Sequence, residues 1–516
     1  MAHPIDASFL ALPLHALADA ALSAATHAGA SFADFRFHRL RSSMLAVRDT
    51  AVQSAVDAAS SGYAVRVIAD GAWGFASSVI ATPEEAAATA RQAVAIARAL
   101  AGVVAERVER ADEPVYRGAE WVSDYDVDPF AVPASDRIAL LLDRSERLLG
   151  AAGVTHTAAS AHSVKENTFY ADTAGTQAVQ QRIRLQPELE ATTVDADSGS
   201  FETMKSLAPP TGRGWEYLTD GWDFDAEIAA IPDYLAEKVK APSIEAGLYD
   251  LVIDPTNLFL TIHESIGHAT EYDRAIGYEA AYAGTSFATP DKLGTLRYGS
   301  GIMNVTGDRT APHGLATVGF DDDGVAAQQW DLIRDGVLVG YQLDRAFARR
   351  LGLPRSNGCA YADSAGNIPI QRMSNVSLTP DPRGGSTDDL ISGVDDGLYI
   401  VGDKSWSIDM QRYNFQFTGQ RFYRIKGGRL AGQVKDVAYQ ATTTDFWGAM
   451  DAVAGPETYR LGGAFNCGKG QPGQVAPVSH GCPAARFRGI TVLNTRSEAG
   501  AAAPGAAGTD SEGGAA

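Results

Sequence analysis

The stretch HESIGHATEYD, residues 263–273, places two histidines and a glutamate inside an otherwise apolar helical segment. In the common His-Glu-x-x-His metal helix the histidines are four residues apart and share one face. His263 and His268 are five residues apart, so on an ideal α-helix their imidazoles point about 140° away from each other. They reach one ion if the helix widens to an i→i+5 turn or ends there, and the conformational tolerance of Gly267 would ease either distortion. Two histidines in unrelated environments are the alternative, but the adjacent Glu264 favours a metal site.

Two histidines do not complete a catalytic zinc site, which typically has three protein ligands and an open position. Cys467 is the best candidate for the third ligand because small, flexible residues surround it and Lys469 would favour its thiolate. Cys482 competes for the role, with His480 close by in the sequence. Cys359 has no comparable context, and an isolated cysteine often serves as a small buried hydrophobic residue.

The chain has 516 residues and a net charge of −20, from 43 basic and 63 acidic residues. Such a length predicts two or more domains. The charge argues against binding to nucleic acids or anionic membranes. No apolar run reaches the roughly 18 residues of a transmembrane helix, and the N-terminus does not resemble a signal peptide. Three cysteines, an odd number at wide spacing, fit a reducing compartment, so we expect a cytoplasmic protein.

Helix and strand patterns predict an α+β protein with two domains. An N-terminal α/β domain is expected over residues 1–241, and a β-rich C-terminal domain that binds the metal over 242–497. Within the first domain, a helix is predicted over 83–108, and a turn at 165–167 is predicted to separate two strands. Residues 498–516 are of low complexity and are expected to be disordered.

Several motifs resemble those of the TldD/PmbA family of metallopeptidases. The metal helix with its following Glu271 and Asp273 is similar to the family hallmark, as are CGK at 467–469 and FRGITV at 487–492. The segments DGVLVGY and IPIQRMSN, which lie between them, are also similar to family segments. The resemblance spans essentially the whole chain and is strongest from 248 to 495.

This resemblance implies that His263, His268 and Cys467 bind Zn²⁺ and that Glu264 is the general base. It also implies the two-part architecture, with the metal in the β-rich domain. Members of the family commonly work in pairs, one subunit with the metal motif and one without it. Because this chain has the motif, it resembles the catalytic subunit. We therefore expect a dimer, either with a related metal-free subunit of the PmbA/TldE type or with a second copy of itself.

Two features leave alternatives open. Glu271 and Asp273 either accept N–H groups from ligand imidazoles or form caps and salt bridges at the surface. The segment GDKSWSIDM at 402–410, followed by QRYNF, departs from the glycine-rich pattern of many family members, so the substrate pocket is not defined by the resemblance.

Three functions are consistent with the sequence. The first is a zinc hydrolase that cleaves unfolded or short peptides. The second is a tailoring enzyme that matures a precursor peptide in a biosynthetic pathway with the same site. The third is a non-catalytic regulatory subunit whose zinc is structural. Glu264 favours the first two functions, because a structural zinc site needs no base.

Overall fold

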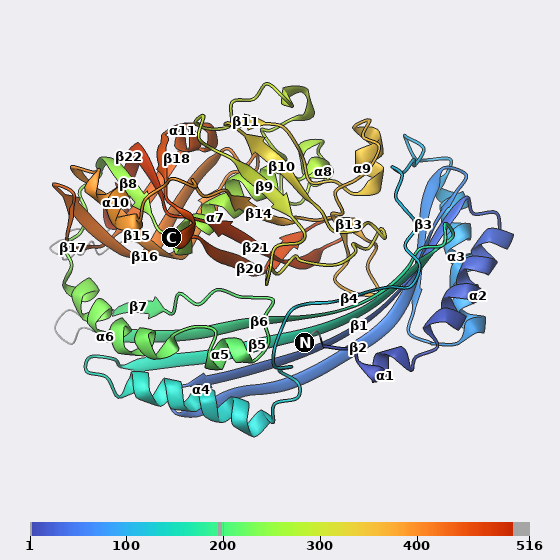
Figure 1. Ribbon diagram of the computed structural model, residues 1–516, viewed down its shortest axis with the longest axis horizontal. Helices are drawn as coiled ribbons and strands as arrows, with labels where there is room; N and C mark the ends of the chain where they lie inside the picture. Colours follow the sequence, from blue (N-terminus) through green and yellow to red (C-terminus); the bar gives the residue numbers. More distant parts are fainter. Residues whose placement is uncertain (1–2, 195–198, 200, 499–516) are drawn as a thin grey trace, which may run out of the picture.

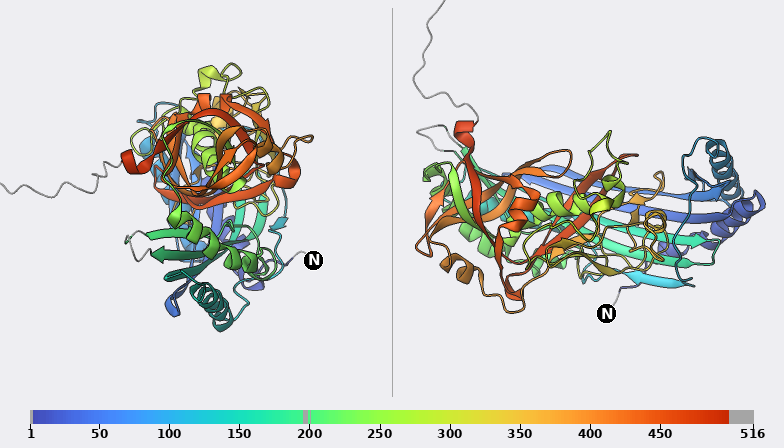
Figure 2. Two further views of the ribbon diagram at one scale, coloured as in Figure 1. Left: turned by 90° about the vertical axis from the view of Figure 1, so that its left-hand side faces the viewer. Right: turned by 90° about the horizontal axis from the view of Figure 1, so that it is seen from above.

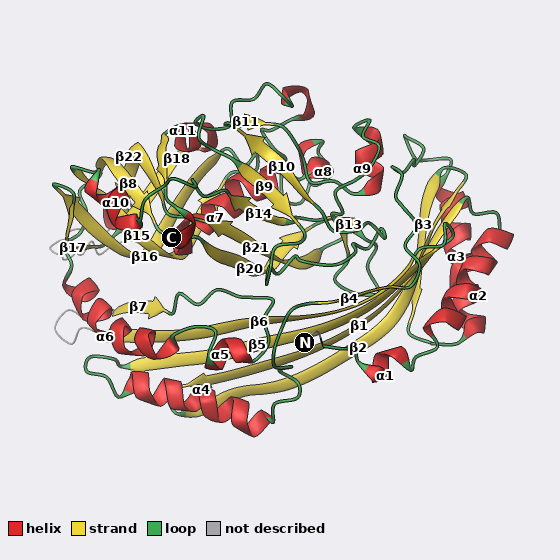
Figure 3. Ribbon diagram, viewed as in Figure 1, coloured by secondary structure: helices red, strands yellow, loops and turns green. Residues whose placement is uncertain are grey.

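The computed structural model describes residues 3–194, 199 and 201–498. The predicted disordered tail therefore lies, from residue 499 onward, outside the described residues. The fold is mixed α and β, as predicted, and its C-terminal part is rich in strands (Figures 1 and 3). Within the part of the chain that the structure describes, none of the helices is long and apolar enough to cross a membrane.

A long, curved, antiparallel sheet forms the N-terminal part of the molecule (Figure 1). Its strand order is β3-β2-β1-β5-β6-β4, with β7 paired to β6 and with β4 parallel to β6. The strands are β1 (Phe32–Arg48), β2 (Ala51–Ala69), β3 (Ala72–Ser78), β4 (Ala119–Val122), β5 (His156–Asp172), β6 (Gln177–Val194) and β7 (Phe201–Lys205).

Helices cover the two ends of this sheet with separate hydrophobic cores. The helices α2 (Leu14–His27) and α3 (Pro83–Leu100) pack at one end, and α4 (Ala134–Leu149) and α6 (Phe224–Lys240) pack at the other. The helix predicted over 83–108 begins as expected, because the Thr82 side chain accepts the Glu85 N–H and Pro83 occupies the first turn. It ends at Leu100, so its predicted C-terminal end was eight residues too long.

The turn predicted at 165–167 was wrong, because these residues lie in the middle of the continuous strand β5. Glu166 is buried there and accepts hydrogen bonds from Arg182 and Arg184 on the neighbouring strand β6. Polar residues at this position therefore do not mark a turn. Glu166 forms ion pairs across the strands, and Lys165 pairs with Asp6 and Asp128, in a part of the sheet where β5 is buried.

The C-terminal part lies against the concave face of the long sheet (Figure 1). Its main sheet has the order β15-β8-β22-β18-β16-β17, and an additional β15–β16 pairing closes it into a barrel. The strands are β8 (Gly247–Ile253), β15 (Asp396–Ile408), β16 (Asn414–Lys426), β17 (Arg429–Val434), β18 (Val437–Thr442) and β22 (Ala485–Asn494), with β19 (Met450–Val453) paired to β22.

Three smaller sheets complete this part: the pair of β12 (Ala360–Tyr361) and β13 (Ile370–Gln371), and two that help to build the site described below. One has the order β11-β10-β9-β14, and the other is the β20–β21 pair. Their strands are β9 (Val305–Asp308), β10 (Gln329–Arg334), β11 (Val337–Leu338), β14 (Asn375–Leu378), β20 (Arg460–Lys469) and β21 (Gln474–Cys482).

Helix α7 (Pro255–Ile262) packs inside the closed sheet, as the left view of Figure 2 shows. Asp254 fixes its start by accepting the Thr256 N–H at 3.0 Å. Its buried Asn257 donates to the Gly402 and Thr418 carbonyls of the barrel, and Tyr439 donates back to the Asn257 amide oxygen. The barrel thus satisfies the polar groups of α7 and fixes the position of the residues that follow this helix.

Charged and polar side chains join the N-terminal sheet to the C-terminal part. Arg36 on β1 donates to Asp322 at 2.8 Å, and Gln180 on β6 donates to the Phe320 carbonyl at 2.9 Å. The domain boundary predicted at 241/242 lies between α6 and β8 and stays a prediction.

Candidate metal centre

The helix that carries the two histidines widens where the sequence predicted. Helix α7 continues as a π-helical turn over His263–Gly267 and then as a 3₁₀ turn over His268–Thr270. The His268 N–H donates to the His263 carbonyl, which is an i→i+5 bond. As a result the imidazole ring centroids are 4.7 Å apart. A spacing of five residues therefore places both rings on the same side of this helix.

Gly267 contributes to this turn in a different way from the one we expected. Its φ of −52° and ψ of −60° are helical values that any residue adopts. The constraint is steric, since a Cβ atom built on Gly267 would lie 2.6 Å from the Met373 sulfur. A larger residue here would require the Met373 side chain, which packs directly against the widened turn, to shift.

Cys467 on β20 lies beside the two histidines. Its Sγ is 3.5 Å from His268 Nε2, and one potential ligand atom from each of His263, His268 and Cys467 lies within 4.8 Å of the other two. All three side chains are buried. In a tetrahedral zinc site with bonds of about 2.0 Å to nitrogen and 2.3 Å to sulfur, a nitrogen and a sulfur ligand atom are about 3.5 Å apart. The donor types and the Sγ–Nε2 separation fit a zinc ion.

His480 on β21 orients His263. His480 Nδ1 lies 2.9 Å from the Val376 carbonyl oxygen, and His480 Nε2 lies 2.7 Å from His263 Nδ1. A carbonyl only accepts, so His480 Nδ1 carries the proton and its Nε2 accepts the His263 Nδ1–H. Burial lowers the pKa of His263 and, further, that of His480, so both rings are neutral at pH 7. This chain of bonds leaves the lone pair of His263 Nε2 free for a metal.

Glu271 orients the second histidine in a similar way. Its carboxylate is fully buried and accepts the His268 Nδ1–H at 2.8 Å, which leaves His268 Nε2 directed toward Cys467. Burial alone would raise the pKa of Glu271, but Lys469 and His268 hold it well below its usual range. Of the two roles left open for Glu271, contact with the imidazole of a candidate ligand is therefore the one observed.

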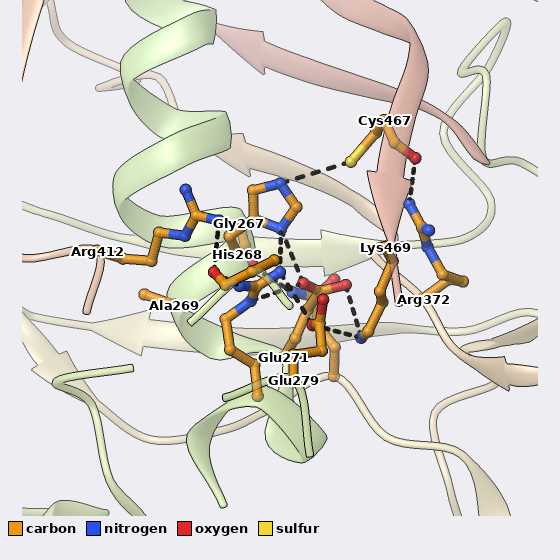
Figure 4. A network of polar contacts seen from close by, with 12 residues as sticks. Gly267, His268, Ala269, Glu271, Glu279, Arg372, Arg412, Cys467 and Lys469 are labelled. Atoms are coloured by element: carbon orange, nitrogen blue, oxygen red, sulfur yellow. Dashed lines mark hydrogen bonds and ion pairs between the residues drawn. The ribbon is translucent and has the colours of Figure 1, made fainter. Parts of the chain in front are cut away.

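Lys469 does not contact the Cys467 thiol, contrary to the sequence-based expectation. Its buried amine donates to Glu271 at 3.1 Å (Figure 4), and also to Asp273 at 2.8 Å and to Gln371 at 3.0 Å. Asp273 is buried beneath the site and touches Lys469 rather than a candidate ligand. Lys469 and Asp273 thus hold Glu271 in place, and the surface role considered for these carboxylates is excluded by their burial.

Glu264 lies on the widened turn directly after His263 and is 6% exposed. Its Oε2 accepts a hydrogen bond from Arg412 Nη1 at 3.0 Å. Burial raises the pKa of Glu264, but the nearby His268, His263 and Arg412 together lower it below its usual value. The carboxylate is therefore ionised at pH 7 and able to accept a proton.

The other two cysteines lie apart from this cluster. Cys482 is fully buried, its Sγ lies 3.7 Å from the Pro255 carbonyl, and burial raises its pKa well above the usual value. Burial also raises the pKa of Cys359 to about 12. Both cysteines are therefore thiols at neutral pH. Because Cys467 lies beside His268 whereas Cys482 lies against the Pro255 carbonyl, the geometry favours Cys467 over Cys482 as the third ligand.

Sequence reasoning missed the roles of Arg412 and His480. Arg412 is 148 residues from Glu264, and His480 is 217 residues from His263, so no local spacing connects them. Two signals were present. His480 lies close to a cysteine that we considered as a ligand, and Arg412 lies just after the segment that departs from the family pattern.

Comparison with known proteins shows similarity to one family of metallopeptidases. Residues 246–494 match the model of the PmbA/TldA metallopeptidase C-terminal domain, and residues 33–97 match that of PmbA/TldA metallopeptidase domain 1. A metalloprotease from Methanothermobacter thermautotrophicus is 28% identical over 466 residues, which cover 90% of this chain and 96% of that protein. A zinc metalloprotease TldD homolog from Saccharolobus solfataricus is 25% identical over 277 residues, which cover 54% and 58%.

Among solved structures, TldE from Thermococcus kodakarensis has a similar fold, with a TM-score of 0.67 and 14% sequence identity. The match covers 92% of this chain and 100% of that chain. At this identity the likeness concerns the fold alone.

Proposed function

The chain belongs to the TldD/PmbA family of metallopeptidases, and from this premise we propose that it is a zinc-dependent peptidase acting on unfolded or short peptides. His263, His268 and Cys467 would hold the ion, and Glu264 would be the general base. The observation that carries the proposal is the position of Glu264. It follows a candidate ligand on a buried turn, yet its carboxylate is bonded to Arg412 and lies outside the cluster of potential ligand atoms.

The side chains of this chain have distinct roles in the proposed reaction. Zinc, when bound, polarises a peptide carbonyl and lowers the pKa of the attacking water toward 7. Glu264 accepts a proton from that water and passes it to the leaving amine. His480 and Glu271 hold the two imidazoles with the proton on Nδ1, which leaves both Nε2 atoms free to bind the ion. Because a thiolate donates more charge than an imidazole, this zinc would be a weaker Lewis acid than one held by three histidines.

The burial of the site supports peptides rather than folded proteins as substrates. His263, Glu264, His268 and Cys467 are each between 4% and 6% exposed. A folded protein surface cannot enter so closed a site, whereas an extended chain is narrow enough to reach it. The substrate sequence and the order of cleavage are set by contacts beyond these four residues.

We also propose that the protein works as a dimer in the cytoplasm. The partner would be a related subunit without the metal motif, as the family resemblance implies, or a second copy of this chain. The similarity in fold to TldE from Thermococcus kodakarensis supports a partner of the same architecture. The three cysteines are free thiols, which fits a reducing compartment.

The two alternative functions make different demands on the same site. Maturation of a precursor peptide would use the same residues and differ in the identity of the substrate. A regulatory subunit with a structural zinc would have no use for Glu264, whose burial beside the ligands is then unexplained.

Glu264→Gln tests the proposed function. The amide keeps the shape of the side chain but cannot accept a proton, so turnover should fall by roughly 10² or more. Zinc should stay bound, because Glu264 is not among the potential ligands. Hydrolysis of a peptide library by the zinc-loaded protein, with and without a partner subunit, gives the turnover, and elemental analysis gives the zinc content. A variant that cleaves peptides at the parental rate would show that Glu264 is not the base.

A further inference from the structure

Arg412 occupies the turn between β15 and β16 and reaches the candidate site from the side opposite Cys467 (Figure 4). Its Nη1 donates to Glu264 at 3.0 Å, and its Nη2 donates to the Ala283 carbonyl at 3.2 Å. The side chain is 12% exposed and that of Glu264 is 7% exposed, so both retain a small solvent-accessible surface. A guanidinium group therefore lies directly beside the proposed base.

The hydrogen-bonding capacity of Arg412 is only partly used. A guanidinium group has five N–H donors in one plane. Among the residues that the structure describes, Glu264 and Ala283 accept from the two terminal nitrogens, while Arg412 Nε is buried and has no acceptor. Buried donors almost always have a partner in native proteins. The guanidinium therefore has N–H groups that can bind an acceptor from outside the chain.

The backbone of Arg412 is strained in the conformation that directs this side chain to Glu264. Its φ is +62°, in the left-handed region that residues other than glycine rarely adopt. Asp409 holds the turn by accepting the N–H groups of Gln411 and Tyr413, and Thr443 donates to the Arg412 carbonyl. Glycine would relieve the strain but would supply no guanidinium. Strain of this kind is commonly retained where the side chain has a function.

The charges around Glu264 also favour an anionic ligand. Within the described residues, the charges of four buried cations around the site are balanced by those of four buried carboxylates. The cations are Arg274, Arg372, Arg412 and Lys469, and the carboxylates are Glu264, Glu271, Asp273 and Glu279. A zinc ion and the Cys467 thiolate would add two positive charges and one negative charge. The loaded site would therefore carry about one excess positive charge in surroundings of low dielectric constant, which attracts an anion.

We propose that Arg412 is a specificity-determining residue that binds a carboxylate of the substrate peptide. The planar fork of a guanidinium matches the two oxygens of a carboxylate, and such bonds are roughly twice as strong as neutral ones. The carboxylate is either the free C-terminus of the peptide or an Asp or Glu side chain near the cleaved bond. This inference rests on the proposed peptidase function and names the chemistry that its substrate must carry.

The test compares peptides that differ in one carboxylate. Four fluorescein-labelled pentapeptides with a common neutral sequence carry a free C-terminus, a C-terminal amide, an internal Glu with the amide, or an internal Gln with the amide. Fluorescence anisotropy measures their Kd for the metal-free chain, which cannot hydrolyse them, and initial rates give kcat/KM for the zinc-loaded chain. The parent should bind at least one of the two acids about 10-fold more tightly than its amide. Whichever acid binds more tightly identifies the source of the carboxylate.

Variants connect this preference to Arg412. Arg412→Gln should remove the difference between acid and amide while leaving the Kd of the amide nearly unchanged. Arg412→Lys should keep part of the difference, because it retains the charge but loses the planar fork. Arg334→Gln, at an exposed arginine paired with Asp331, is the matched control and should behave like the parent. Circular dichroism verifies folding, and Arg412→Lys decides the question if Arg412→Gln does not fold.

Equal binding of acids and amides by the parent, or no binding of either, overturns the proposal. An equal loss for all four peptides in the Arg412 variants also overturns it, because Arg412 would then only position Glu264. A zinc-loaded parent that cleaves none of the peptides contradicts the proposed function instead. The anisotropy measurement still reports on Arg412 in that case, so the two failures are distinguishable.

Discussion

Replacing His480 with phenylalanine should weaken zinc binding although His480 is not a ligand. The ring fills a similar volume but can neither accept the His263 Nδ1–H, 2.7 Å away, nor donate to the Val376 carbonyl at 2.9 Å. His263 then has no partner that fixes its proton on Nδ1. Its neutral ring can move the proton to Nε2, the atom that has to be free for the metal.

The expected magnitude follows from these two bonds. Loss of a partner that orients a metal-binding histidine typically reduces metal affinity 10- to 100-fold, which is about 1.4–2.7 kcal/mol. The free energy of unfolding should also fall, by about 1–3 kcal/mol for each of the two buried groups left unpaired. His480→Gln can both accept and donate, so it should show smaller losses on both measures.

Competition with a chromophoric chelator at pH 7 measures the zinc affinity, and urea unfolding measures stability. His156→Phe, at a histidine that is 53% exposed and paired with Asp49, is the matched control. It should bind zinc like the parent. If folded His480→Phe binds zinc as tightly as the parent, the bond from His480 to His263 does not prepare the ligand, and this reasoning is wrong.

Three further outcomes are expected. Glu271→Gln should retain an acceptor for His268 but lose its negative charge, so zinc affinity measured with the same chelator should fall about 10-fold, and an unchanged affinity would contradict the role given to Glu271. Glu166→Gln should lower the free energy of unfolding by about 3–5 kcal/mol, because Arg182 and Arg184 are left as buried cations without their carboxylate partner. Burial would raise the pKa of Glu166, but both arginines and His38 hold it well below 4.5. The ionised carboxylate therefore stabilises the fold fully above about pH 4.5, and its contribution is lost as the pH falls further. In urea unfolding between pH 6 and pH 3.5, the free energy of unfolding should fall less with decreasing pH in Glu166→Gln than in the parent. Light scattering at micromolar concentration should show a dimer, alone or with the metal-free subunit, and a fully active monomer would argue against the proposed assembly.

The sequence was most informative where function requires a local pattern. The separation of His263 and His268 predicted that a shared ion requires the helix either to widen to an i→i+5 turn or to end there, and the structure has the widened turn. The reason given for Gly267 was wrong, since its backbone angles are ordinary helical values and the close contact of this position is with Met373, more than 100 residues away. Local spacing thus predicted the backbone but not what packs against it.

Other errors share this cause. Lys469 is two residues from Cys467, yet its amine binds Glu271 and Asp273, because sequence proximity does not determine where a long side chain ends. Polar residues at 165–167 resembled a turn, whereas Glu166 pairs across strands in a buried layer. Partners far apart in the chain decided both cases, so no single window of sequence contained the answer.

The central claim is that His263, His268 and Cys467 hold one zinc ion, and its most direct test compares two cysteines. Zinc content per chain should be measured by elemental analysis for Cys467→Ser and Cys482→Ser purified side by side. Cys467→Ser should lose most of its zinc, because a neutral hydroxyl is a poor substitute for a thiolate. Cys482→Ser should keep about one zinc per chain, because its sulfur lies against the Pro255 carbonyl, away from the two histidines. The reverse pattern, with Cys467→Ser loaded and Cys482→Ser empty, would contradict the proposed site.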